Sequence, residues 1–412
     1  MSILITNIHQ LVQVHPNNVM LVKGNDMKAL PVLENAYVYI EHDTIIEYGP
    51  MSECEGFDPE TTIDATNKLV LPSWCDSHSH LVFAGNRSKE FVDKINGLSY
   101  EEIAMRGGGI LNSVNQIANT SLDDLYTQSL DRLNQVIALG TGAIEIKTGY
   151  GLETEAELKM LKVIGKLKKD SQAFILPTLL AAHAIPEMYK SDKASYVNQI
   201  INDLIPKAAA LKIAKYIDVF CEKGYFSVED MNKILAAGKN YQLQPKVHVN
   251  QFNILGGVPA ATDHNALSVD HLELLDEKDI QALVQSNTIP VALPGCSFYL
   301  GIPYTPARQI LEAGLPLALA SDYNPGSAPS GNMNFIVSLA CVKMKLTPEE
   351  AINAATINGA YAMGISSMYG SITRGKKANL IITNPMDHYR EIAYNFGRNP
   401  VDQVIVNGKL WA

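Results

Sequence analysis

The stretch WCDSHSHLVFAGNR, residues 74–87, places two histidines one residue apart at the end of a short apolar segment. Side chains alternate in direction along a strand, so His78 and His80 point to one face and Cys75 points to the other. Two imidazoles on one face can bind the same metal ion. Two histidines that only form hydrogen bonds in a core or at the surface fit this spacing equally well.

Eight short segments rich in apolar and β-branched residues, of which this is the first, alternate with longer helical patterns through the middle of the chain. This alternation is typical of a parallel sheet covered by helices, and eight strands predict an α/β fold, a (β/α)₈ barrel of the TIM type. The segments end near His80, Thr148, His183, Glu222, Asn250, Glu273, Gly295 and Asp322.

The two ends of the chain differ from the middle. Residues 1–66 and 367–412 contain short alternating strands and turns, without long helical patterns. We expect them to pair as one small composite β-sandwich domain formed by both termini, beside a barrel of residues 67–366.

Three capping boxes mark helix starts between the strands, because a Ser or Thr side chain and an acidic residue three positions later can satisfy free amides. They place Tyr100 and Tyr150 on connecting loops. The pairs are Ser99 with Glu102, Thr154 with Glu157, and Thr347 with Glu350.

The composition limits the classes of partner. A net charge of -10 without a basic cluster argues against nucleic acid, and no apolar run is long enough for a membrane helix. The five cysteines are scattered, odd in number and without a CxxC pair, which argues against a disulfide framework and a thiolate zinc site. We expect a cytoplasmic protein that binds a small molecule.

Other polar residues end predicted strands just as His78 and His80 do. His183, His248, His271 and Asp322 end the third, fifth, sixth and eighth strands, and barrel enzymes build their sites at this rim. Five of the ten histidines therefore fall together, which chance would rarely give. The rest, which we expect to be structural or surface residues, are His9, His15, His42, His264 and His388.

This arrangement of His78, His80, His248, His271 and Asp322 on strands one, five, six and eight resembles that of the amidohydrolase superfamily. The terminal segments resemble its composite β-sandwich, and the resemblance covers essentially the whole chain. It implies His78, His80, His248 and Asp322 as metal ligands, and Asp322 and His271 as catalytic groups.

The resemblance also implies one divalent metal ion per chain. Members with two metals usually carry a carboxylated lysine on strand four, whereas this strand reads YIDVFCEKG and Lys223 lies beyond its end. Nitrogen and oxygen ligands without thiolate suit zinc, iron or manganese. Zinc and iron are the expected choices.

Several strings resemble one branch of the superfamily more closely, among them EIKTGYGL, AAHAIPE, SVDHLE, LPGCSFYLG and ASDYNPGSAPS. This branch hydrolyses the ring amide bond of 4-imidazolone-5-propanoate to N-formimidoyl-L-glutamate in histidine degradation, and the resemblance implies a homodimer. Two alternatives stay open: a cyclic-amidine deaminase of the guanine or cytosine type, and a barrel that has lost catalysis and serves as a binding scaffold.

The substrate of this branch carries a carboxylate, and Arg87 lies on the loop that leaves strand one. A guanidinium can clamp a carboxylate with two hydrogen bonds, whereas a lone arginine is more often a solvated surface residue. With the resemblance, we expect Arg87 to bind the propionate. The other positions that the resemblance implies as substrate contacts are Tyr100, Tyr150, His183, Gln251, Asn324, Gly326 and Ser327.

Four further residues have simpler expected roles. Glu145 and Lys147 share one face of strand two, which should look into the barrel, and we expect them to form a structural ion pair. Cys296 is expected to be a packed free thiol. Gln251 can form hydrogen bonds but cannot act as a base.

Overall fold

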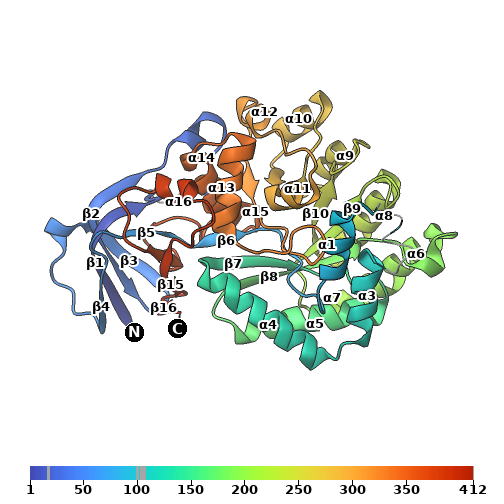
Figure 1. The fold of residues 1–412 in the computed structure, drawn as a ribbon, viewed down its shortest axis with the longest axis horizontal. Helices are drawn as coiled ribbons and strands as arrows, with labels where there is room; N and C mark the ends of the chain where they lie inside the picture. The colour runs from blue at the N-terminus through green and yellow to red at the C-terminus, as the bar shows by residue number, and fades with distance from the viewer. Residues whose placement is uncertain (16–18, 99–101, 103–107, 412) are drawn as a thin grey trace.

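The computed structural model describes residues 1–15, 19–98, 102 and 108–411 (Figure 1). These residues form two sheets, one of which closes into a parallel barrel while the other joins both ends of the chain. In Figure 1 the N-terminal strands in blue and the C-terminal strands in red lie together on the left, beside the barrel.

The barrel contains the eight strands that the sequence predicts, in sequence order and each parallel to the next. The (β/α)₈ prediction is therefore confirmed. The strands are β6 (Trp74–Asp76), β7 (Thr141–Lys147), β8 (Phe174–Ala182), β9 (Tyr216–Cys221), β10 (Gln244–Val249), β11 (Ser268–His271), β12 (Ile289–Ala292) and β13 (Ala318–Leu319).

The barrel closes just beyond the ends of its first and last strands. The backbone amide of Asp322 donates to the carbonyl of His78 at 3.0 Å, and the amide of His80 donates to the carbonyl of Tyr323 at 2.9 Å. A bridge between Ser79 and Tyr323 lies between these bonds. Closure therefore takes place at the candidate metal ligands.

Helices cover the outside of the barrel and contribute to a large apolar core with its strands. None of the helices in the described ranges is long and apolar enough to cross a membrane. The α-helices are α1 (Ser88–Ile95), α3 (Ile110–Asn119), α4 (Leu122–Ala138), α5 (Thr154–Asp170), α6 (Lys193–Gln199), α7 (Ile205–Ala210), α8 (Val228–Lys239), α9 (Gly257–Asp263), α10 (Glu277–Val284), α11 (Pro294–Leu300), α12 (Ala307–Glu312), α13 (Met333–Met344), α14 (Pro348–Ala355), α15 (Ile357–Ala362) and α16 (Arg390–Tyr394). Short 3₁₀ and π turns are η1 (Gly24–Lys28), η2 (Met51–Glu53), η3 (Glu187–Tyr189) and η4 (Ile200–Leu204).

The second sheet confirms that both ends of the chain build one β-domain. Its central strand β5 pairs with β1 from the N-terminal part and with β14 from the C-terminal part. This β-domain has its own apolar core, separate from that of the barrel, which includes Ile5, Val38 and Ile405. The strands are β1 (Ser2–Val12), β2 (Val32–Glu41), β3 (Thr44–Pro50), β4 (Thr61–Asp64), β5 (Leu69–Pro72), β14 (Leu380–Thr383), β15 (Val401–Val406) and β16 (Lys409–Leu410).

The segment before His78, expected as one barrel strand, divides between the two sheets. The amide of Ser73 donates to Asn379 in the small domain, whereas the amide of Trp74 donates to Gly140 at the base of the barrel, both at 2.9 Å. The chain therefore passes from one sheet to the other within two residues.

The expected capping boxes have different outcomes. The box of Thr347 and Glu350 is confirmed at the start of α14. The box of Thr154 and Glu157 is wrong, because Thr154 donates to Asp203 and Glu157 accepts hydrogen bonds from the preceding loop. In the third box, Ser99 lies outside the described residues.

Candidate metal centre and substrate pocket

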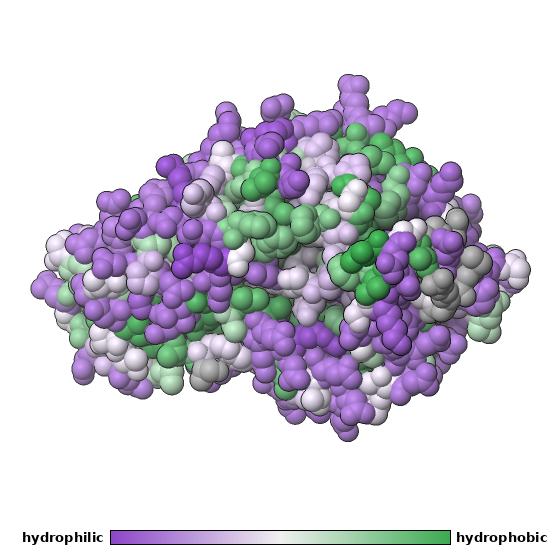
Figure 2. Space-filling model, viewed as in Figure 1, coloured by the Kyte–Doolittle hydropathy of each residue, from purple (hydrophilic) through white to green (hydrophobic). Residues whose placement is uncertain are grey.

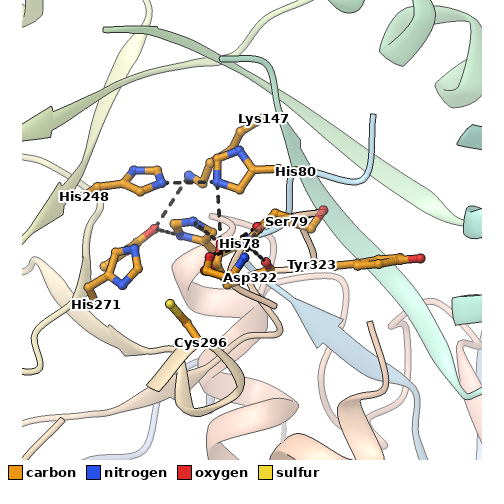
Figure 3. Close-up of polar contacts among 12 residues, drawn as sticks. His78, Ser79, His80, Lys147, His248, His271, Cys296, Asp322 and Tyr323 are labelled. Atoms are coloured by element: carbon orange, nitrogen blue, oxygen red, sulfur yellow. Dashed lines mark hydrogen bonds and ion pairs between the residues drawn. The ribbon is translucent and has the colours of Figure 1, made fainter. Parts of the chain in front are cut away.

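Four histidines and one aspartate meet at the carboxyl-terminal rim of the barrel (Figure 3). His78 and His80 follow β6, His248 lies on β10, His271 ends β11, and Asp322 follows β13. The Nε2 atoms of His80 and His248 are 3.3 Å apart. Asp322 Oδ1 lies 3.6 Å from His78 Nε2 and 3.7 Å from His80 Nε2.

The donor atoms fit a divalent cation. Two nitrogens bound to one tetrahedral zinc ion at about 2.1 Å are roughly 3.4 Å apart, close to the separation of His80 and His248. His78 Nε2 is buried and has no hydrogen-bond partner among the described residues, as expected for an atom that faces an ion. Three groups of side chains have ligand atoms within 4.8 Å of one another: His78, His80 and Asp322; His78, His248 and His271; and His271, Glu273 and Cys296.

A buried carboxylate holds the outer nitrogen of His78, and a second one lies close to that of His248. His78 Nδ1 donates to Asp270 at 2.6 Å, and His248 Nδ1 lies 3.0 Å from Asp218. Such contacts fix the ring orientation and leave Nε2 for the metal. Neither aspartate was predicted from the sequence, although a carboxylate inside a predicted buried strand is itself a signal.

A buried ion-pair network lies beneath the centre. Lys147 Nζ contacts Glu145 at 2.6 Å, which confirms the expected ion pair, and Asp218 at 2.8 Å. Lys246 pairs with the other oxygen of Glu145. Glu145 therefore joins the two lysines, and Lys147 joins Glu145 to Asp218, in one network.

The protonation of the imidazoles differs across the site. Burial holds the pKa values of His78 and His80 well below the usual range, so both are neutral, as metal ligands must be. Burial also lowers the pKa of His183 to about 3. Burial acts to lower the pKa of His271 too, but the Glu273 carboxylate 3.3 Å away outweighs this and raises it.

Two of these residues have left-handed backbones, with φ of 88° at His271 and 53° at Asp322. Such conformations cost on the order of 1 kcal/mol or more and cluster at functional sites. Local hydrogen bonds hold both: Thr305 donates to the His271 carbonyl at 2.6 Å, and Asn324 donates to the Asp322 carbonyl at 2.6 Å.

A small cavity opens above the cluster and brings together most of the expected substrate contacts. His183 donates to the Gly149 carbonyl at 2.9 Å through Nδ1, which leaves its other nitrogen free. Phe220, which was not predicted from the sequence, also lines the cavity. The expected contacts found in its wall are Tyr150, His183, Gln251, Asn324 and Ser327.

Arg87 does not line this cavity but a larger one beside it. Its Nε and Nη2 atoms lie 2.8 and 2.6 Å from Glu90 Oε2, so part of the guanidinium is already bound. The remaining nitrogen faces Gly326, where an added Cβ would lie 2.2 Å from Arg87 Nη1. Asn324 fixes this turn by accepting from the amides of Gly326 and Ser327, both at 2.8 Å.

Two other expectations concern single residues. Cys296 is fully buried, as expected of a packed thiol, and accepts from Gln251 Nε2 at 3.3 Å at the edge of the site. Burial raises the pKa of its thiol, so it stays protonated. Tyr100 lies outside the described residues.

Comparison with known proteins gives one consistent relationship. Residues 207–411 match the amidohydrolase family. The whole chain is 57% identical over 410 residues to a protein from Christiangramia forsetii named imidazolonepropionase, and 56% identical to one of that name from Flavobacterium psychrophilum. Both alignments cover 100% of each chain. A protein of the same name from Alkaliphilus metalliredigens is 38% identical over 99% of this chain and 97% of its own.

Solved structures with the same fold include an adenosine deaminase from Xanthomonas campestris with bound zinc, with a TM-score of 0.72 and 17% identity over 99% of this chain and 92% of that one. A guanine deaminase from C. acetobutylicum with bound guanine has a TM-score of 0.71 and 16% identity over 100% of both chains. At these identities the likeness concerns the fold alone.

Proposed function

The chain belongs to the imidazolonepropionases of the amidohydrolase family, and on this premise we propose how its own residues carry out the reaction. It hydrolyses the ring amide C–N bond of 4-imidazolone-5-propanoate and gives N-formimidoyl-L-glutamate, a step of histidine degradation. The observation that carries this assignment is the 57% identity over the full length of both chains.

One divalent ion per chain, zinc or iron, is held by His78, His80, His248 and Asp322. The convergence of three imidazoles and one carboxylate supports this ligand set. When bound, such an ion polarises a carbonyl group and lowers the pKa of a water molecule toward about 7. Elemental analysis should find one ion per chain. Two ions, or none after gentle purification, would contradict the site.

Variants separate the ligands from other histidines. His248→Ala should lose the metal because it removes a direct bond to the ion. His264→Ala is the matched control, since His264 is a partly buried histidine that contacts Asn232 instead. Equal metal loss in both variants would contradict the ligand set.

Asp322 moves the proton. Water attacks the ring carbonyl carbon, and the Asp322 carboxylate accepts the proton that the water loses. The C–N bond then breaks, and Asp322 returns the proton to the departing ring nitrogen, since a neutral nitrogen leaves more easily than an amide anion. Burial raises the pKa of Asp322, opposed by the nearby imidazoles of His271 and His248.

His271 and His183 assist this step. The Glu273 carboxylate raises the pKa of His271, and an imidazole that donates a hydrogen bond can orient the water or stabilise the developing oxyanion. His183 is neutral and uses Nδ1 on Gly149, so its Nε2 can accept a hydrogen bond from the substrate ring.

The remaining contacts select an acidic substrate. Arg87 binds the propionate with the part of its guanidinium that Glu90 leaves free, and the Gly326 turn holds the guanidinium in place. The other substrate contacts are Tyr100, Tyr150, Gln251, Asn324, Gly326 and Ser327.

A deaminase is the competing function, because the solved structures of similar fold include deaminases. Purified metal-loaded protein is incubated separately with 4-imidazolone-5-propanoate, guanine and cytosine, while ring absorbance and ammonia are followed. We expect loss of absorbance with the first compound and no ammonia from any. Ammonia released from guanine or cytosine would support the deaminase instead.

The protein also acts in the cytoplasm, as a homodimer, without nucleic-acid or membrane partners. The five cysteines are unpaired, which suits a reducing compartment. Figure 2 shows hydrophobic side chains gathered over the position of α1, where Phe91, Val92 and Ile95 are exposed, and such a patch can support subunit contact. Light scattering at a mass of one chain would contradict the dimer.

A further inference from the structure

We infer that Lys147 positions the metal centre by holding, with one ammonium group, the two carboxylates that orient the imidazoles of His78 and His248. This inference rests on the proposed metal site and adds a residue to it that makes no contact with metal or substrate. This role of Lys147 differs from a simple ion pair with Glu145, because it depends on the contacts of Lys147 with Asp218 and Asp270.

The contacts converge on single oxygen atoms. Lys147 Nζ lies 2.8 Å from Asp218 Oδ2, and this same oxygen lies 3.0 Å from His248 Nδ1. Nζ also lies 3.6 Å from Asp270 Oδ2, the oxygen that accepts from His78 Nδ1 at 2.6 Å. One cation therefore contacts both carboxylates, and each carboxylate lies next to one of the two proposed ligand histidines.

The second oxygen of each carboxylate is also held. Asp218 Oδ1 accepts from the backbone amide of His248 at 3.1 Å, and Asp270 Oδ1 accepts from the Ser268 hydroxyl at 2.5 Å. With both oxygens occupied, neither carboxylate can rotate without losing a bond. Lys147 supplies the contact that the two carboxylates share.

Lys246 provides a comparison within the same network. Both lysines are fully buried and both pair with Glu145. Lys246 donates its other hydrogen bond to the carbonyl of Ser77 at 3.1 Å, and within the described residues it makes no ion pair with Asp218 or Asp270 at 4.0 Å or less. Burial raises the pKa of Asp270, and the charges of Lys246 and Lys147 both oppose this, so what distinguishes Lys147 is its direct contact with the two carboxylates.

The test uses two double variants with matched charge. Lys147→Met/Glu145→Gln and Lys246→Met/Glu145→Gln each remove one buried cation and the same buried anion, so each keeps the charge balance of the barrel. The pair differs in which lysine is lost. Circular dichroism and thermal unfolding of the metal-free proteins check that both are folded.

Zinc affinity is then measured by competition with a chromophoric chelator, without substrate. Loss of a partner behind a metal ligand typically weakens affinity by about 10–100-fold. We expect a loss of about tenfold or more in Lys147→Met/Glu145→Gln, and a loss below about threefold in Lys246→Met/Glu145→Gln. Excess zinc should restore most of the kcat of the Lys147 variant, because its ligands are intact.

The outcomes separate this inference from the proposed function. Equal affinity losses in the two variants, or none in the Lys147 variant, would overturn the role of Lys147 and leave the metal site standing. If the Lys147 variant does not fold, the single variant Lys147→Arg replaces it. An arginine at this position keeps the charge but not the geometry, so wild-type affinity there would also overturn the inference. A wild-type protein that binds neither zinc nor ferrous iron would overturn both the metal site and this inference.

Discussion

The backbone amide of Asp322 donates a hydrogen bond to the carbonyl of His78 at 3.0 Å, so two proposed metal ligands also join the first and last strands of the barrel. Strand pairing reaches from β6 to β13 but does not link them directly within the described residues. The barrel therefore closes at the proposed metal centre.

Removal of the metal should loosen this closure. Metal bound only by the folded state stabilises it by about 2.7 kcal/mol when the free metal is about 100 times its Kd, so chelation should lower the Tm. In hydrogen exchange, the amides of Asp322 and His80 should exchange faster after chelation, whereas amides between β8 and β9 serve as the internal control. Unchanged exchange at the Asp322 amide after chelation would contradict the prediction, because it would show that the barrel stays closed without the metal.

Arg87→Lys should raise the KM for 4-imidazolone-5-propanoate by about tenfold or more while the metal content stays unchanged. Lysine keeps the charge but loses the planar group that binds Glu90 and the propionate together. Gly326→Ala should have a similar effect, because its methyl group would displace Arg87 Nη1. If the KM of the variant for a substrate analogue without the carboxylate rises by as much, Arg87 does not recognise the propionate.

His271→Asn should keep the metal and near-normal substrate binding but lower kcat by about 100-fold or more. Asparagine can donate a hydrogen bond but carries no charge, so it cannot replace the imidazolium that Glu273 favours. Metal content and kcat are measured on the same sample. A near-normal kcat would give His271 a structural role and leave Asp322 as the proton carrier.

The pH dependence of stability should report on Lys376, which lies far from the site in sequence and donates to Ser366, Tyr369 and Ser371. Burial lowers the pKa of Lys376 from 10.5 to about 8. The unfolded chain therefore holds this proton more tightly, and the free energy of unfolding should rise between pH 8 and 10.5. The rise is roughly 2–3 kcal/mol relative to Lys376→Met, measured by urea unfolding. Parallel pH profiles of the two proteins would contradict it.

The barrel could be predicted because strand length and polar strand ends are local features of the sequence. The segment before His78 shows the limit of this reasoning. The segment from Leu71 to Trp74 shows no clear break, and only the hydrogen bonds to Asn379 and Gly140 separate the two sheets. Partners more than 60 residues away cannot be identified from such a run alone.

The candidate site could likewise be predicted only in part from the sequence. The ends of strands predicted His78, His248 and Asp322, whereas the partners behind them were missed because they depend on how neighbouring strands are aligned. Asp270 meets His78 across 192 positions of the chain. Glu157 failed as a capping residue for a similar reason, since the amides of Gly149, Gly151 and Leu152 compete for its carboxylate.

The most direct test of the proposed reaction is a single turnover of the metal-loaded protein with 4-imidazolone-5-propanoate in ¹⁸O-labelled water, with the product identified by mass spectrometry and NMR. If water attacks the ring carbonyl carbon, one ¹⁸O atom should enter the new carboxylate beside the nitrogen-bearing carbon of N-formimidoyl-L-glutamate, without release of ammonia. Label in a formyl group would mean that the amidine carbon is attacked instead, and would contradict cleavage of the ring amide bond.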